Sequence, residues 1–387
     1  MPARLGGAGA GSAAADVSVA DSPLASLESL TQAAVIAVVG IAIVISNLLI
    51  IAAFLNFKGL AHEVINYYLL SLAVADLLCG LLVVPLSVHA AAVGRWVFGG
   101  LVCRLTGYIE VTLWSVSVYT FMWISVDRYL AVRKPLRYET VSLTVAIFFI
   151  LLYLEYGPPR LLDRRSCLLL TSLHEVVFLS FEPDAGLTHA LRQVQTRTRS
   201  QCWMVFTWIS AAMLCCPPLL GYKKEANYDA RTFICMLDWA STYAYTATLG
   251  ILVLGPSLIS IVYNYYYIFA MRRKLNSGAP MHDKEYATAL AENLANPSHC
   301  MSFLLVAAFW LSWIPYFALQ IYEYFTAPVV KVPMLHFGVV WLGILNSFWK
   351  IVILITFSPQ FRLAPLDPVP YVLPRQEPPT GGAHRHG

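Results

Sequence analysis

The sequence predicts an all-α membrane protein, a seven-transmembrane helix bundle, and three observations support this prediction. Of the 387 residues, 58% are hydrophobic and only 12% are charged, about half the charged fraction of a soluble domain. The apolar residues are gathered in separate blocks of roughly 20, the length of a helix that crosses a bilayer. The basic residues lie between these blocks, so the net charge of +4 does not indicate nucleic-acid binding. A soluble enzyme, a disordered chain and a disulfide-stapled secreted module are therefore disfavoured.

Seven apolar blocks are expected to form helices, because backbone groups in lipid must find their hydrogen-bond partners within the chain. In chain order the blocks cover approximately residues 33–55, 67–90, 103–129, 202–220, 243–270, 301–325 and 334–357. With the N-terminus placed outside, the 26 Lys and Arg residues divide into 18 inside, 7 outside and one within a block. Basic residues accumulate on the cytoplasmic side, so we expect an extracellular N-terminus and a cytoplasmic C-terminus.

The two ends of the chain differ from the blocks in composition. Residues 1–32 are rich in Ala, Gly and Ser and are expected to form a disordered extracellular tail. They lack the basic start and the apolar core of a cleavable signal peptide. Residues 365–387 are Pro-rich and are expected to form a disordered cytoplasmic tail. The seven-helix domain would then occupy residues 33–364.

Residues 142–194 interrupt the pattern between the third and fourth blocks. Their apolar run of about 13 residues is too short to span a bilayer comfortably, and Gly157, Pro158 and Pro159 then stop any helix. We favour an atypical cytoplasmic insertion foreign to the fold, such as retained non-coding sequence or a splice variant. The alternatives are a long cytoplasmic loop with a buried piece and an additional span, which would reverse the orientation downstream.

Six blocks carry motif residues in a consistent order. These are Asn47 in the first block, Asp76 in the second, Asp127, Arg128 and Tyr129 at the end of the third, Trp208 in the fourth, Pro256 in the fifth, and Phe309, Trp313 and Pro315 in the sixth. The series resembles the rhodopsin-like (class A) G-protein coupled receptors, over all of the chain except its tails and 142–194. One such motif is weak evidence, whereas the whole series is specific.

The resemblance implies a receptor of orphan type, with 33–364 as the receptor domain and an atypical insertion in the second cytoplasmic loop. Such a receptor would bind an unknown extracellular small molecule or peptide, or be constitutively active, as a multi-pass protein of the plasma membrane. It would engage a heterotrimeric G protein at Asp127, Arg128 and Tyr129, with Arg128 paired to Asp127 at rest. It would catalyse no reaction, hold no cofactor or metal, and have the lipid bilayer but no nucleic acid as a partner.

Cysteine placement predicts one disulfide. Of the eight cysteines, only Cys103 and Cys235 lie on the extracellular side of the expected topology. They can pair in the compartment that permits disulfides, which would tie the loop 222–242 over the third helix, as in the resembling family. Two free thiols are the alternative.

Glu110 lies two turns inside Cys103, and a carboxylate within a span marks a candidate functional site. Resembling receptors for amines hold an Asp here that pairs with the ligand's ammonium, so an amine ligand is one interpretation. The alternatives are an internal bond to His89 or His336, or a protonated side chain. Pro315 is expected to kink the neighbouring sixth helix beside the pocket. The expected ligand pocket consists of Glu110, Trp114, Thr248, Trp313, Tyr316, Phe317, Gln320, His336 and Val340.

The seventh block departs most from the resembling family. Where that family has Asn-Pro-x-x-Tyr, the run 350–354 has Lys for Asn, no Pro, and Leu for Tyr. A Lys within a span costs about 2.5–3.5 kcal/mol unless it finds a partner. Family geometry places Lys350 beside Asn47, Asp76 and Ser117, so we expect it to pair with Asp76 where such receptors often hold a sodium ion. The alternative is that its ammonium reaches the cytoplasmic interface.

Two rival functions follow from the same departures. A receptor-like chain that does not signal, or a mis-spliced product, fits both Lys350 and the segment 142–194. A small transporter would need polar residues along a continuous pore, and only Asp76, Glu110 and Lys350 lie deep in the blocks. A retinal pigment is disfavoured, because the Lys of its Schiff base would stand where this chain has Ile344.

Overall fold

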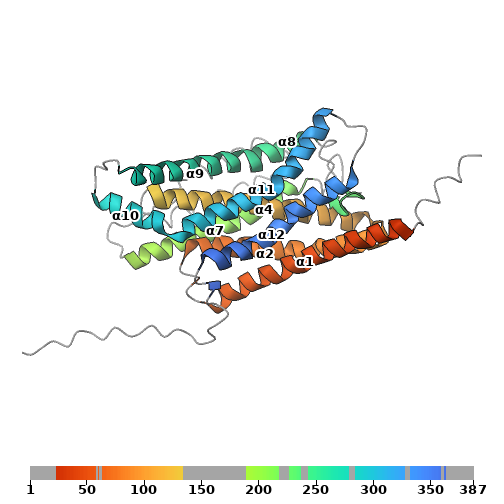
Figure 1. Ribbon diagram of the computed structural model, residues 1–387, viewed down its shortest axis with the longest axis horizontal. Helices are drawn as coiled ribbons and strands as arrows, with labels where there is room; N and C mark the ends of the chain where they lie inside the picture. The colour runs from red at the N-terminus through yellow and green to blue at the C-terminus, as the bar shows by residue number, and fades with distance from the viewer. Residues whose placement is uncertain are drawn as a thin grey trace, which may run out of the picture.

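The computed structural model describes residues 23–57, 60, 63–133, 189–217, 226–236, 243–278, 284–326, 332–358 and 361–362. Over these residues the chain is almost entirely helical, and Figure 1 shows the long helices lying side by side along the long axis. The expected tail 365–387 lies outside the described residues. So do residues 1–22 of the expected N-terminal tail and residues 142–188 of the proposed insertion. The described part confirms the expected all-α bundle.

Within the described residues, seven passes run along the bundle. Five are single helices, namely α1 (Pro23–Asn56), α4 (Gly99–Arg133), α7 (His189–Cys215), α11 (Pro297–Thr326) and α12 (Pro333–Phe357). The second pass is α2 (Val64–Leu82) followed by α3 (Val84–Val93), and the fifth is α8 (Tyr243–Leu249), the π-helical turn η2 (Gly250–Leu254) and α9 (Gly255–Asn276). A short helix, α10 (Lys284–Ala295), lies at one end, and a hairpin of β1 (Asn227–Asp229) and β2 (Ile234–Met236) joins α4.

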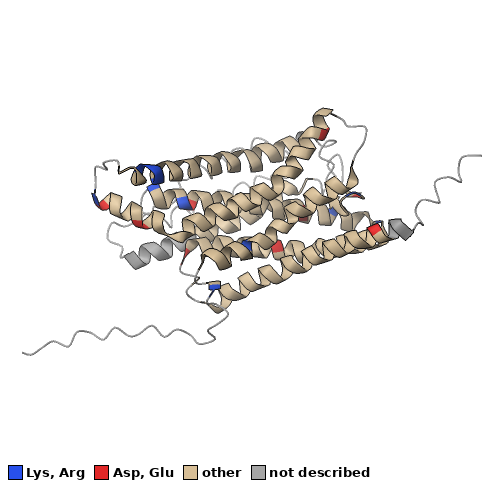
Figure 2. Ribbon diagram, in the orientation of Figure 1, with Lys and Arg blue, Asp and Glu red and all other residues tan. Residues whose placement is uncertain are grey.

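The surface of the bundle suits lipid. Among the described residues, six passes contain a segment long and apolar enough to cross a membrane, and α7 adds the shorter apolar stretch Ser200–Cys215. Large apolar side chains point outward, such as Ile259 and Leu311, which are 72% and 68% exposed. Figure 2 shows most of the charged positions gathered toward the ends of the helices. Water would not favour so much exposed apolar surface, so the bundle is a multi-pass membrane domain.

Two helix starts differ from the sequence prediction. α1 begins at Pro23, so residues 23–32 are helical rather than part of a disordered tail, and Ser29 Oγ donates to the Ala91 carbonyl of α3 at 3.1 Å. α7 begins at His189, so residues 189–194, the last part of the proposed insertion, are helical. Polar residues extend both helices beyond their apolar blocks, which is why the blocks alone placed the starts too late.

Three passes have irregular points in their helices. Val83 separates α2 from α3, and α3 carries a proline in its first turn, where no helical amide is needed. The π-helical turn η2 widens the fifth pass directly before Pro256. Pro315 lies inside α11, as expected, and removes one helical hydrogen bond there. α11 therefore has a defined point at which it can pivot.

α4 lies at the centre of the bundle, with 72% of its apolar segment buried, the highest share among the passes described. It packs against α2, α7, α9 and the hairpin. Phe121 of α4 stacks on Phe309 of α11 with ring centroids 4.7 Å apart, and Trp123 donates to Thr207 Oγ1 of α7 at 3.1 Å. These contacts hold the second half of α4 against α7 and α11.

Candidate functional site

One end of the bundle, which we name the hairpin end, is covered by β1 and β2. The strands pair antiparallel with Tyr228 opposite Cys235, and Cys235 forms the expected disulfide with Cys103 of α4, with Cα atoms 5.3 Å apart. Gly107 of α4 allows the close approach, because a Cβ there would lie 2.7 Å from Ala226 Cβ and 3.0 Å from the Cys235 carbonyl oxygen. The hairpin is thus fixed directly on α4.

The turn of the hairpin enters the bundle beside α12. Phe233 has a φ of 60°, a conformation uncommon for a residue with a side chain, and its buried ring lies edge-on to Phe337 at 6.2 Å. Trp341 Nε1 donates to the Thr232 carbonyl at 3.0 Å. The hairpin is therefore fastened to α12 as well as to α4.

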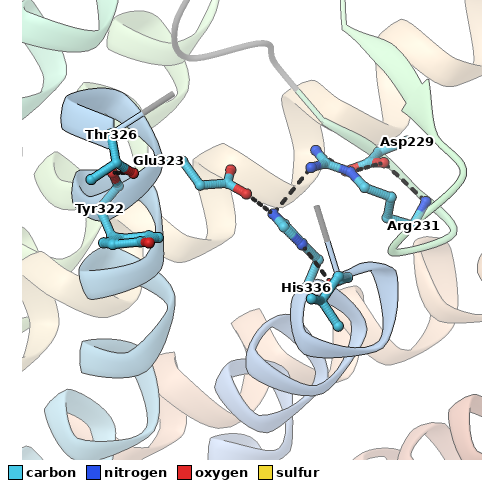
Figure 3. A network of polar contacts seen from close by, with 7 residues as sticks. Asp229, Arg231, Tyr322, Glu323, Thr326 and His336 are labelled. Atoms are coloured by element: carbon cyan, nitrogen blue, oxygen red, sulfur yellow. Dashed lines mark hydrogen bonds and ion pairs between the residues drawn. The ribbon is translucent and has the colours of Figure 1, made fainter. Parts of the chain in front are cut away.

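Four polar side chains form a network at this end (Figure 3). Arg231 makes two hydrogen bonds of 3.0 Å to the Asp229 carboxylate, and its Nη1 lies 3.0 Å from His336 Nε2. The same His336 nitrogen lies 2.8 Å from Glu323 Oε1 of α11. Of these four residues, the sequence predicted only His336 as a site residue. Asp229 and Arg231 carry opposite charges two residues apart in one loop, which could have indicated that they pair. Glu323 joins the network only through the tertiary structure.

Aromatic side chains of the expected pocket gather between α4 and α11. Trp114 of α4 lies 6.1 Å from Trp313 and 6.0 Å from Phe317, measured between ring centroids. Tyr316 stands 5.8 Å from Trp313 and 5.6 Å from Phe317, and Val340 is buried in the same cluster as Tyr316. Thr248 and Gln320 are half-buried on α8 and α11. The structure thus brings together four of the expected pocket rings and Val340.

Glu110 is the carboxylate nearest to these rings along α4. Its Oε2 atom is buried, and no hydrogen-bond partner for it occurs among the described residues. The expected alternative of a bond to His336 is wrong, because both ring nitrogens of His336 have other neighbours: Val332, Arg231 and Glu323. Glu110 therefore offers a buried acceptor toward the interior of the bundle.

Lys350 forms an ion pair with Asp76, which joins α12 to α2 as expected. The alternative, in which Lys350 reaches the membrane interface, is wrong, because its side chain is only 3% exposed and its ammonium points to the carboxylate. Asn47 and Ser117 instead donate within their own helices, to Ile43 O at 2.8 Å and Leu113 O at 3.1 Å. Two buried charges of opposite sign therefore occupy the middle of the bundle.

The Asp-Arg-Tyr segment lies at the opposite end, which we name the α10 end. Arg128 forms the expected ion pair with Asp127, and its Nη1 donates to Ser298 Oγ of α11 at 2.8 Å. Tyr129 is buried, and its hydroxyl accepts a hydrogen bond from Arg133 at 2.6 Å. Ser298 was not predictable from the sequence, because a lone serine belongs to no recognisable motif. Arg128 thus connects α4 to α11 by a neutral acceptor rather than by an acid.

Comparison with known families identifies the class of protein. The family model described as 7 transmembrane receptor (rhodopsin family) matches residues 46–154 and 165–349. The chain belongs to this family, as its motifs implied, and is a G-protein coupled receptor. Members of the family are receptors rather than enzymes. The match enters 142–194 from both sides and leaves only 155–164 of that segment unmatched.

Individual relatives agree with this assignment. The chain is 25% identical to G-protein coupled receptor 52 of Mus musculus over 341 residues, covering 86% of this chain and 79% of that protein. It is 28% identical to trace amine-associated receptor 7e of Mus musculus over 332 residues, covering 83% and 77%. The crystal structure of squid rhodopsin superposes with a TM-score of 0.63 at 19% identity, covering 88% of this chain and 84% of that one. The last likeness supports the seven-helix fold.

Proposed function

We propose that this receptor binds an extracellular ligand with a cationic amine at Glu110 and signals to a heterotrimeric G protein through Asp127, Arg128 and Tyr129. The observation behind the ligand class is the buried Glu110 oxygen, which has no hydrogen-bond partner among the described residues. A buried carboxylate is costly without a partner, and an ammonium group supplies both charge and donors. Similarity to a trace amine-associated receptor supports the same class.

The remaining pocket residues fit a cation of this kind. Trp114, Trp313, Tyr316 and Phe317 present aromatic faces, which attract a cation by about 0.5–2 kcal/mol per favourable contact. In this proposal Thr248, Gln320, His336 and Val340 complete the lining nearer to the hairpin. The site is mostly apolar with few polar groups, as small-molecule sites usually are.

In this proposal the hairpin end faces the outside of the plasma membrane and the α10 end faces the cytoplasm. The disulfide at the hairpin end suits the oxidising side of the membrane. Arg272, Arg273 and Lys274 at the end of α9 suit the cytoplasmic side, where basic residues accumulate.

The proposed mechanism is a shift of population between two arrangements of α11. Trp313 contacts the ring of Trp114 at the ligand site, and Pro315 lies two residues further along α11. A ligand that displaces Trp313 would rotate α11 about Pro315 and draw Ser298 away from Arg128. Arg128 would then be open to the G protein.

The proposal is tested with the full chain in cells, using a panel of aliphatic and aromatic amines and a cyclic-nucleotide readout. The variant Glu110→Gln keeps the shape but removes the charge, so the concentration for half-maximal response should rise by about 30-fold or more. Glu28→Gln is the control, because Glu28 is an exposed acid on α1. An amine response in Glu110→Gln equal to that of the unchanged receptor would refute Glu110 as the ligand's partner.

A second candidate, a receptor-like chain that does not signal, is favoured by the Lys350–Asp76 pair. The pair joins α2 to α12 at a position where the family has Asn instead of Lys350. It would hold these two helices together and so oppose their rearrangement. Surface expression and ligand-independent signalling are compared for chains with and without residues 142–194. Signalling restored by the deletion supports a mis-spliced product, whereas silence of both chains at equal surface expression supports the second candidate.

A further inference from the structure

His336 is held between two partners with opposite requirements. Its Nδ1 lies 3.1 Å from the Val332 carbonyl, which can only accept, so Nδ1 carries a hydrogen. Its Nε2 lies 3.0 Å from Arg231 Nη1 and 2.8 Å from Glu323 Oε1, as Figure 3 shows. A guanidinium only donates and a carboxylate only accepts, so one state of Nε2 cannot satisfy both neighbours.

The protonation state of His336 decides which neighbour is satisfied. A neutral imidazole with its hydrogen on Nδ1 has a lone pair on Nε2, which accepts from Arg231 and faces the Glu323 carboxylate unfavourably. A protonated imidazole donates from Nε2 to Glu323 and repels the Arg231 cation. One proton therefore exchanges a bond to the hairpin for a bond to α11.

We propose that His336, Glu323 and Arg231 form a proton-binding site through which extracellular acid loosens the hairpin and ties α12 to α11. The site shares His336 with the proposed pocket lining but uses neither Glu110 nor the aromatic rings around it. It goes beyond the proposed function, although it relies on the hairpin end facing outward. Histidine is the side chain that ordinarily titrates between about pH 5 and 8, the range an extracellular surface meets.

The other charged groups near His336 leave this exchange intact. Asp229 holds Arg231 through two hydrogen bonds, which raise the pKa of Arg231 and keep it cationic. Tyr316 of α11 also lies in the field of Arg231. α1 is the third element beside the start of α12, after the hairpin and α11. Its Glu28 lines a hollow with Met334 of α12. The Arg231 side chain is 32% exposed and Glu323 14%, so solvent protons have access.

Loss of the Arg231 contact would weaken the attachment of the hairpin to α12 without removing it. The Trp341 hydrogen bond to Thr232 and the Phe233 contact with Phe337 remain. Acid should therefore increase the opening of residues 226–236 without releasing them from α4, to which the disulfide ties them. The expected response is therefore a hairpin that opens more often while it stays attached to α4, not an unfolded loop.

The test is hydrogen exchange of the full chain in lipid nanodiscs, at about pH 7.5 and about pH 5.5, with rates corrected for intrinsic chemistry. Amides of residues 226–236 should open roughly tenfold more at the lower pH, the factor that an ordinary hydrogen bond to a charged group represents. His336→Gln keeps hydrogen bonding but takes up no proton, and it should abolish the pH response. The control His89→Gln, at an exposed histidine of the same end, should retain it.

Glu323→Gln provides an independent arm should His336→Gln fold poorly. Without the carboxylate the protonated ring loses its acceptor of opposite charge, so the midpoint of hairpin opening should move to lower pH. Hairpin exchange that is independent of pH in the unchanged chain would overturn the proposal. A full pH response in folded His336→Gln, or an unmoved midpoint in Glu323→Gln, would overturn it equally.

Discussion

At the scale of single residues, Lys350 and Asp76 illustrate how a buried charge is tolerated. Each alone would be expensive within the membrane, and together they form an ion pair in which the Lys350 side chain is 3% exposed. The residue that breaks the family's pattern in the seventh pass is therefore compensated by a partner in the second. Both members of such a pair have to change together.

This pairing predicts that Asp76→Asn destabilises the receptor by about 3–5 kcal/mol, because it leaves the Lys350 ammonium buried without its carboxylate. The measurement is the Tm of the purified full chain. The double variant Asp76→Asn with Lys350→Met should recover most of the loss, since it removes both charges. Equal Tm values for Asp76→Asn and the unchanged chain would contradict the pairing, as would sodium-dependent stability that Asp76→Asn abolishes.

Gly343 permits the position of Trp313. A Cβ at Gly343 would lie 2.9 Å from the Trp313 ring, whereas a Cβ at Gly338 of the same helix would meet nothing within 4 Å. Gly343→Ala should therefore overpack the site and cost about 1–3 kcal/mol, and Gly338→Ala should not. Thermal unfolding of the two variants checks this. A Gly343→Ala receptor as stable as Gly338→Ala would show that Trp313 does not rest on that surface.

The charges within the apolar blocks were predictable from the local sequence, whereas the polar network at the hairpin end was not. Glu110, Asp76 and Lys350 stand out because each is a charge within an apolar block. The network of Asp229, Arg231, Glu323 and His336 draws on three elements that are distant in the chain, so only the fold reveals it. Ser298 carries no charge and no motif, and its role beside Arg128 was beyond local inference.

At the scale of elements, the passes were predictable because apolar length alone marks them. The helix ends were not, since polar residues continue α1 and α7 beyond their apolar blocks. α10 was missed entirely because it has 12 residues and only one apolar face. Its Leu290 is fully buried and its Tyr286 hydroxyl donates to the Val132 carbonyl of α4 at 3.4 Å. α10 thus covers the end of α4 close to Arg128.

Because α10 covers the end of α4 near Arg128, we expect a partner that approaches Arg128 to displace α10, and loosening α10 should raise ligand-independent signalling. Leu290→Ala removes a fully buried side chain, a change that typically costs about 2–5 kcal/mol. The measurement is basal cyclic-nucleotide signalling at matched surface expression. Glu292→Ala, at an exposed position on the same helix, should leave the basal level unchanged. Unaltered basal signalling in Leu290→Ala would show that α10 does not restrain coupling.

At the scale of the whole molecule, the central helix α4 contributes residues to the sites at both ends of the bundle. α4 carries Cys103 and Glu110 toward the hairpin end and Asp127, Arg128 and Tyr129 toward the α10 end. α11 runs beside it in the opposite chain direction, with Ser298 at the α10 end, Tyr316 toward the hairpin end, and Pro315 between these two residues. A change at one end can therefore reach the other through two adjacent helices, provided that the two ends face opposite sides of a membrane.

The placement of the ends is tested most directly by epitope tags at the two termini of the full chain. In intact cells an antibody should stain the N-terminal tag alone, and the C-terminal tag should become accessible only after permeabilisation. Seven passes require this result, because an odd number of spans puts the termini on opposite sides. Staining of both tags in intact cells, or of neither, would contradict the receptor topology and with it the assignment of the two sites.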